Sequence, residues 1–163
     1  MFFNFTTLEV FFMNNPNYTI SDFEKYLNQK RFEFNSHRRN GIQYVNKKLI
    51  DMGRTLGEYP EVWKIKSNRV KGCTTNVFIH IYLTNGKIFY SGNSDSEIVK
   101  GQLALLINGL NMLTPEEIVN QTEQYLTDFV NNTDVRFSMT ISRANSLGTL
   151  YQFMKIKAKE FLY

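Results

Sequence analysis

The chain contains one cysteine, Cys73, and the residues around it are of the kinds that can activate a thiol. A thiol becomes a nucleophile only as its thiolate, which requires a lowered pKa and access to a partner. Lys71 and Arg69 precede the cysteine closely enough to supply positive potential, and Gly72 leaves the backbone free to turn. Most unpaired cysteines are small buried hydrophobes. Taken alone, these residues therefore favour a packing role over chemistry.

His80 is the only nearby residue that could serve as a base for a stand-alone thiol enzyme. It follows Cys73 by an odd number of residues, which would place the two side chains on opposite faces of a strand. No cysteine, aspartate or second histidine lies at ligand spacing from it. The sequence therefore predicts a structural or surface histidine and no metal site.

A basic and aromatic stretch offers an alternative from another functional class. Lys64 and Lys66, with Arg69 and Lys71, could form a basic rim around an aromatic strand face, as in modules that stack nucleic-acid bases. The formal net charge is only +4, with an isoelectric point near 9.1. That excess does not by itself imply a nucleic-acid partner.

The segment after the cysteine is expected to be a β-hairpin. An apolar run from Val77 to Leu83 alternates aliphatic and aromatic side chains, and a shorter run from Ile88 to Tyr90 follows it. The dipeptide Asn85-Gly86 between them favours a tight turn in which both central residues have positive φ.

Helical patterns surround this hairpin on both sides. Helices are predicted from a Ser21 cap through Phe34, over residues 42–56, over 98–110 after a Ser94–Glu97 capping box, after Thr114-Pro115, and from a Ser142 cap towards the C-terminus. Trp63, in the loop ahead of the cysteine, is expected to be buried in the core. The order predicts a single α+β domain: a small antiparallel sheet of about three strands packed against N-terminal and C-terminal helices.

Four motifs occur in the order in which the SufE family of sulfur-acceptor proteins carries them. They are residues 71–77 (KGCTTNV), 92–101 (GNSDSEIVKG), 113–119 (LTPEEIV) and 142–147 (SRANSL). The chain resembles that family, which serves iron–sulfur cluster assembly, from about Tyr44 to Lys159. The resemblance implies a SufE/IscU-like domain over residues 41–163. Residues 1–40 would be an N-terminal extension with one helix and a flexible arm.

The function that this resemblance implies is transfer of sulfur. Cys73 would take persulfide sulfur from a SufS-like cysteine desulfurase, stimulate that enzyme, and pass the sulfur to an iron–sulfur scaffold complex. The chain would be a partner and activator of the desulfurase rather than an independent enzyme. It would bind no cofactor itself, because pyridoxal phosphate belongs to the desulfurase, and neither nucleic acid nor membrane would be a partner.

The resemblance also implies supporting residues and a location. Arg69, Lys71, Gly72, Asp95 and Arg143 would bind the partner or position the cysteine loop, although Asp95 could serve only the helix start and Arg143 could be an exposed first-turn residue. We expect residues 69–76 to shelter Cys73 at rest and to swing out on docking. A single cysteine fits a reducing compartment, which would be the bacterial cytoplasm, a plastid or a mitochondrion.

Overall fold

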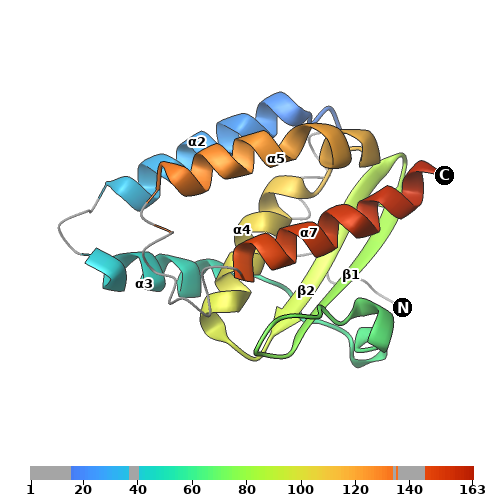
Figure 1. The fold of residues 1–163 in the computed structure, drawn as a ribbon, viewed down its shortest axis with the longest axis horizontal. Coiled ribbons are helices and arrows are strands. Elements are labelled where there is room, and N and C mark those ends of the chain that lie inside the picture. The colour runs from blue at the N-terminus through green and yellow to red at the C-terminus, as the bar shows by residue number, and fades with distance from the viewer. Residues whose placement is uncertain (1–15, 37–40, 134, 136–145) are drawn as a thin grey trace.

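The computed structural model describes residues 16–36, 41–133, 135 and 146–163. Figure 1 shows helices packed against a β-hairpin, which confirms the predicted α+β class. In chain order the elements are α2 (Ile20–Asn35), α3 (Gly41–Gly53), the 3-10 turns η2 (Glu61–Trp63) and η3 (Lys66–Asn68), β1 (Val77–Thr84), β2 (Lys87–Ser94), α4 (Glu97–Leu110), α5 (Pro115–Asn131), α7 (Ser146–Lys159) and the 3-10 turn η5 (Glu160–Leu162).

The sheet in the described residues has two antiparallel strands, where about three were expected. The register runs from Val77 opposite Ser94 to Thr84 opposite Lys87. A third strand is reduced to one isolated bridge between Arg69 and Phe78, because the chain turns into η3 on one side of that bridge and into the cysteine loop on the other.

The predicted hairpin turn is confirmed. Asn85 and Gly86 both have positive φ, at 52° and 74°, as a tight turn between twisted strands requires. Side chains alternate along β1, so that Val77 and Ile79 are buried while the aromatic residues face outward. The hairpin therefore presents one apolar face to the helices and one aromatic face away from them.

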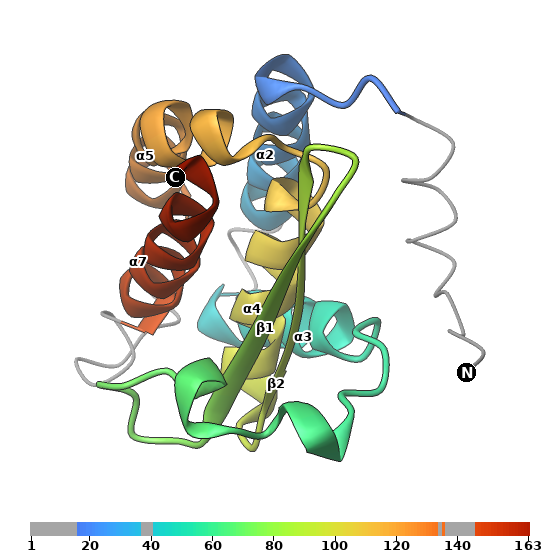
Figure 2. The same cartoon turned by 90° about the vertical axis from the view of Figure 1, so that its right-hand side faces the viewer.

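Helix α4 is the centre of the core. Leu103, Leu105, Leu106 and Leu110 are all at most 1% exposed. Figure 2 shows the hairpin lying across α4, with α5 and α7 side by side next to it. Burial on nearly every side of α4 agrees with the apolar residues all round its sequence.

Two helix starts differ from the sequence prediction. The cap of α2 is Thr19 rather than Ser21, because the Thr19 backbone N–H donates to the carboxylate of Asp22, three residues on, at 3.0 Å. The cap of α4 is Ser96 rather than Ser94, because β2 continues through Ser94 and buries it. Ser96 Oγ accepts from the backbone N–H of Val99 instead.

The other helix predictions have mixed outcomes. The predicted cap of α5 is confirmed, with Thr114 and Glu117 exchanging side-chain and backbone hydrogen bonds. Helix α3 ends at Gly53, three residues before the expected end. The Ser142 cap lies outside the described residues. Helix α2 packs its buried Phe34 edge-on against Phe129 of α5, with ring centroids 6.3 Å apart.

Candidate functional site

The cysteine loop, residues 71–76, leaves the core and returns to it at a fixed base. The Val70 backbone N–H donates to the Val77 carbonyl at 2.9 Å, and both valine side chains are buried. Buried apolar anchors joined by a backbone hydrogen bond resist opening. We therefore expect any motion of the cysteine to be confined to the loop beyond this base.

A hydrogen-bonded chain of three side chains joins the base of the loop to the start of α4. Arg69 Nη2 donates to Asn76 Oδ1 at 2.8 Å, and Asn76 Nδ2 donates to Asp95 Oδ2 at 2.9 Å. The Asp95 backbone N–H also donates to the Asn76 carbonyl at 3.2 Å. Arg69 and Asp95, which are far apart in the sequence, therefore meet through Asn76.

Cys73 itself is half-buried and packs against the edge of the hydrophobic core. Burial raises the pKa of its thiol above the ordinary value of 9.0. The Arg69 guanidinium, which was expected to supply positive potential, donates to Asn76, and Lys71 is exposed. The resting loop therefore favours the protonated, unreactive thiol.

Two neighbours of Cys73 shape the loop: Gly72 turns the backbone, and Thr75 has a buried hydroxyl without a hydrogen-bond partner. Gly72 has φ of +86°, a conformation that favours glycine, and it lies beside Thr149 of α7. Thr75 Oγ1 is buried without a hydrogen-bond partner. A buried hydroxyl without a partner costs free energy. The Thr75 hydroxyl therefore destabilises the loop conformation in which it is buried.

His80 lies on the outer face of β1, where neighbouring groups hold it in place. Its ring stacks on Trp63 with centroids 4.1 Å apart, and its Nδ1 is 3.3 Å from Asn68 Nδ2. Burial lowers the pKa of His80, which favours its neutral form. Trp63 is half-buried in this stack, so the expectation that it would be a fully buried core residue is wrong.

Part of the aromatic face and of the basic rim, which suggested a nucleic-acid module, is engaged within the chain. Tyr82 stacks on Phe89 with centroids 5.3 Å apart, as Trp63 stacks on His80. Lys64 pairs with Glu61. A ring that stacks on another ring has one face fewer for a base, and an ammonium group paired with a carboxylate is less available to a phosphate.

The remaining predicted residue, Arg143, lies outside the described residues. Asn76 was not among the predicted site residues, although it stands within the KGCTTNV motif and bonds both Arg69 and Asp95. Within the described ranges there is no group of three or more histidine, cysteine, aspartate or glutamate side chains that could hold a metal ion. In the same residues, every helix is too short or too polar to cross a bilayer.

Comparison with known proteins identifies relatives of the chain. The model of the SufE family, described as an Fe–S metabolism associated domain, matches residues 30–158. An uncharacterised SufE-like protein of Synechocystis is 43% identical over 113 residues, which cover 69% of each chain. A cysteine desulfuration protein, SufE of Plasmodium falciparum, is 27% identical over 133 residues, which cover 78% of this chain and 52% of the relative.

A solved structure shows the same fold at lower sequence identity. The solution structure of a hypothetical protein from Thermus thermophilus superposes with a TM-score of 0.66 and 19% identity. The superposition covers 84% of this chain and 96% of the Thermus protein. At this level of identity the likeness supports the arrangement of helices and hairpin and nothing further.

Proposed function

The chain belongs to the SufE family, whose domain is associated with iron–sulfur metabolism, and from that premise we propose that Cys73 accepts sulfur from a cysteine desulfurase. The donor would be the persulfide on the active-site cysteine of a pyridoxal-phosphate-dependent, SufS-like enzyme. The name of the Plasmodium relative, a cysteine desulfuration protein, supports this donor. The acceptor after Cys73 would be an iron–sulfur scaffold complex.

The transfer is a thiol exchange that needs no external oxidant or reductant. The Cys73 thiolate attacks the outer sulfur of the donor persulfide, a new S–S bond forms, and the S–S bond of the donor breaks. The donor cysteine leaves as its thiolate, and Cys73 carries the persulfide. Removal of the sulfur frees the donor for another turnover, which is how an acceptor without its own catalytic base would stimulate the enzyme.

The observation that carries the proposal is the placement of Cys73 on a loop with a fixed base. The hydrogen bond between Val70 and Val77 anchors the base, while Cys73 is half-buried beyond it. At rest, partial burial limits the oxidation and reduction to which an exposed persulfide is open. On docking, the loop would swing about its base and bring the sulfur to the partner, where a more polar environment would lower the pKa of the thiol.

The test is transfer of labelled sulfur to the intact protein. The protein is mixed with a SufS-type cysteine desulfurase and isotope-labelled cysteine, and intact mass is measured without reductant. We expect one added sulfur on the wild type and none on Cys73→Ser. A variant that combines Cys73→Ser with Thr74→Cys moves the thiol to the next residue, which is exposed. It tests whether sulfur transfer depends on the position of the thiol as well as on its presence.

Two outcomes would contradict the proposal. The first is a wild-type protein that gains no sulfur while the desulfurase alone turns over cysteine. The second is a Cys73→Ser protein that gains as much sulfur as the wild type, which would assign the label to another group.

A further inference from the structure

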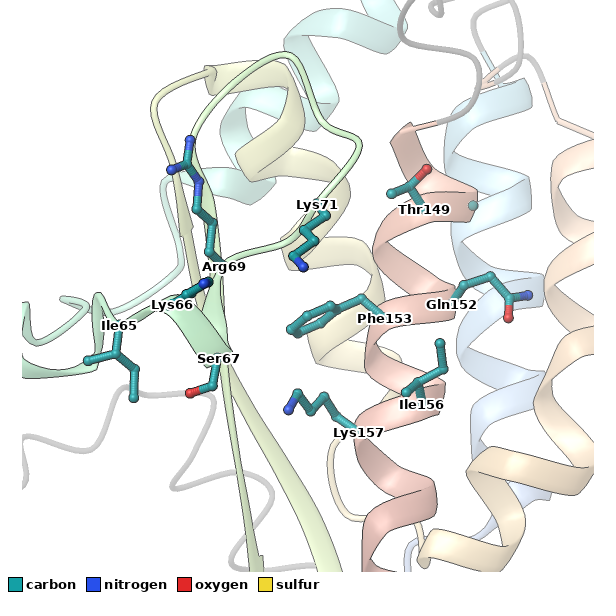
Figure 3. Close-up of a pocket in the computed structure, with 11 residues that line it drawn as sticks. Ile65, Lys66, Ser67, Arg69, Lys71, Thr149, Gln152, Phe153, Ile156 and Lys157 are labelled. Carbon is teal, nitrogen blue, oxygen red and sulfur yellow. The ribbon is translucent and has the colours of Figure 1, made fainter.

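A groove opens beside the cysteine loop, between two segments that are distant in the sequence. Residues 65–71 form one wall and residues 148–157 of α7 form the other. Figure 3 shows Lys71, Phe153 and Lys157 extending into the space between these walls. Its volume of about 1240 Å³ exceeds the ~300–1,000 Å³ of pockets that enclose small molecules. The groove therefore has room for a segment of a partner protein.

The charge of the groove has one sign. Lys66, Arg69, Lys71 and Lys157 line it, and its described lining includes no aspartate or glutamate. Lys157 is 3.3 Å from Glu160 outside the lining, and the Arg69 guanidinium bonds Asn76. Lys66 and Lys71 are exposed, so they remain to attract negative charge.

Between these charges the groove exposes apolar surface. Ile156 is 61% exposed and Ile65 is 51% exposed, and they stand on opposite walls. The partly buried Phe153 lies between them, with the Lys157 ammonium 5.8 Å from its ring centre. Exposed aliphatic side chains rimmed by charge are typical of a surface that buries an amphipathic segment of a partner.

We propose that this groove is the docking site for an acidic, amphipathic segment of the cysteine desulfurase that donates sulfur to Cys73. The inference rests on the proposed function for the identity of the partner, and on charge complementarity for the chemistry of the segment. The groove adjoins the loop directly, because Lys71 lines it and Gly72 lies next to Thr149 of its far wall. A segment seated there would hold the partner beside Cys73.

The lining favours a peptide over a nucleic acid. Bases bind single-strand sites by stacking on exposed aromatic rings, whereas the exposed apolar residues of the groove are isoleucines. The single ring, Phe153, is partly buried and lies near Lys157. Leucine or isoleucine side chains of a helix would match this surface, with its glutamates or aspartates reaching Lys66 and Lys71.

The first test uses the full chain labelled with nitrogen-15 and a synthetic amphipathic peptide with leucines on one face and glutamates on the other. We expect amide shifts at residues 65–71 and 148–157, and none with the same peptide carrying lysines. The double variant Lys66→Glu with Ile156→Ser is expected to weaken binding about tenfold, because it reverses a charge and removes apolar contact. Lys159→Glu with Phe32→Ser changes exposed residues outside the groove and should retain the wild-type affinity.

Shifts confined to another surface, or equal weakening by both double variants, would overturn the proposal. Stronger binding of a single-stranded oligonucleotide to the same residues would also overturn it and would assign the groove to nucleic acid.

The second test measures sulfur transfer from the desulfurase as a function of the concentration of this protein. The groove variant should need about tenfold more protein for half-maximal transfer, with Cys73 fully loaded at saturation. A wild type that binds the acidic peptide but never gains sulfur would refute the proposed function and leave the groove intact. Normal concentration dependence of the groove variant would refute the groove as the docking site and leave sulfur transfer intact.

Discussion

The Cys73 thiol is protonated at neutral pH in the resting loop, because burial raises its pKa above 9.0. Folding favours the protonated form, so the contribution to stability is present below the ordinary pKa and is lost as pH rises through the raised value. The same rise in pKa means that the nucleophilic thiolate forms only at higher pH. We therefore expect Cys73 to react slowly with thiol reagents while the loop is closed and faster where the loop is opened.

The pH dependence of alkylation tests this point. We expect the rate of reaction of Cys73 with iodoacetamide to rise with a midpoint above pH 9.0 in the folded protein, because burial disfavours the thiolate. In urea the midpoint should fall to the ordinary value. Equal midpoints in the two states would show that the resting loop leaves the thiol solvated.

Asn76 is expected to hold the loop closed through its two side-chain hydrogen bonds. Asn76→Ala removes both, and a typical loss of about 1 kcal/mol corresponds to roughly fivefold faster labelling of Cys73 at fixed pH. Asp95→Asn is the matched control, because its amide oxygen can still accept from Asn76 and the rate should change less than twofold. Identical rates for Asn76→Ala and the wild type would place the restraint elsewhere.

At the scale of elements, α3 and α4 approach closely enough that glycine is required between them. A Cβ on Gly101 would clash with the Leu49 carbonyl oxygen, and a Cβ on Gly53 would lie 2.8 Å from the Gly101 nitrogen. Both obstacles are backbone atoms, which cannot rotate away as a side chain can. Gly101, the last residue of the 92–101 motif, therefore sets the distance between these two helices.

We predict that Gly101→Ala lowers the free energy of unfolding by about 2 kcal/mol or more, because the helices must separate to admit the methyl group. Gly148→Ala is the matched control in α7, since nothing lies within 4 Å of its Cβ position. That variant should gain about 0.5–1 kcal/mol from the higher helix propensity of alanine. Urea denaturation monitored by circular dichroism measures both, and a neutral Gly101→Ala would contradict the close packing.

At the scale of the whole molecule, α2 contributes to the same core as the helices that carry the family motifs. Phe23, Leu27 and Phe34 are buried along α2, and the Tyr18 hydroxyl donates to the Gly109 carbonyl at the end of α4 at 2.9 Å. The family match begins at residue 30, inside this helix. The division of the chain into residues 1–40 and 41–163 stays a prediction.

Phe34→Ala tests whether α2 stabilises the whole chain. Phe34 is 2% exposed, so its loss should lower the free energy of unfolding by about 3–5 kcal/mol through lost burial and a cavity. Phe32, 76% exposed on the same helix, is the control, and Phe32→Ala should change stability by less than ~0.5 kcal/mol. Equal stability of Phe34→Ala and the wild type would mean that α2 is a separate, weakly attached segment.

Features that depend on neighbouring residues were predictable from the sequence. The Asn85-Gly86 turn and the Thr114 cap follow from backbone preferences that act within a few residues, and they are observed. The caps at Ser21 and Ser94 were misplaced because serine, threonine and aspartate can all cap a helix, and several of them lie close together at each helix start. The hydrogen bond to Asp22 selects Thr19 for α2, and the continuation of β2 through Ser94 leaves Ser96 to cap α4.

The sequence by itself determined the cysteine, the four motifs around it, the hairpin turn and the α+β order of elements. Only the tertiary structure decided the direction of the pKa shift of Cys73, the junction of Arg69, Asn76 and Asp95, and the groove between residues 65–71 and α7. The physical reason is how far apart in the sequence the interacting residues lie. Turn geometry arises between adjacent residues, whereas burial and surface charge arise where segments distant in the chain meet.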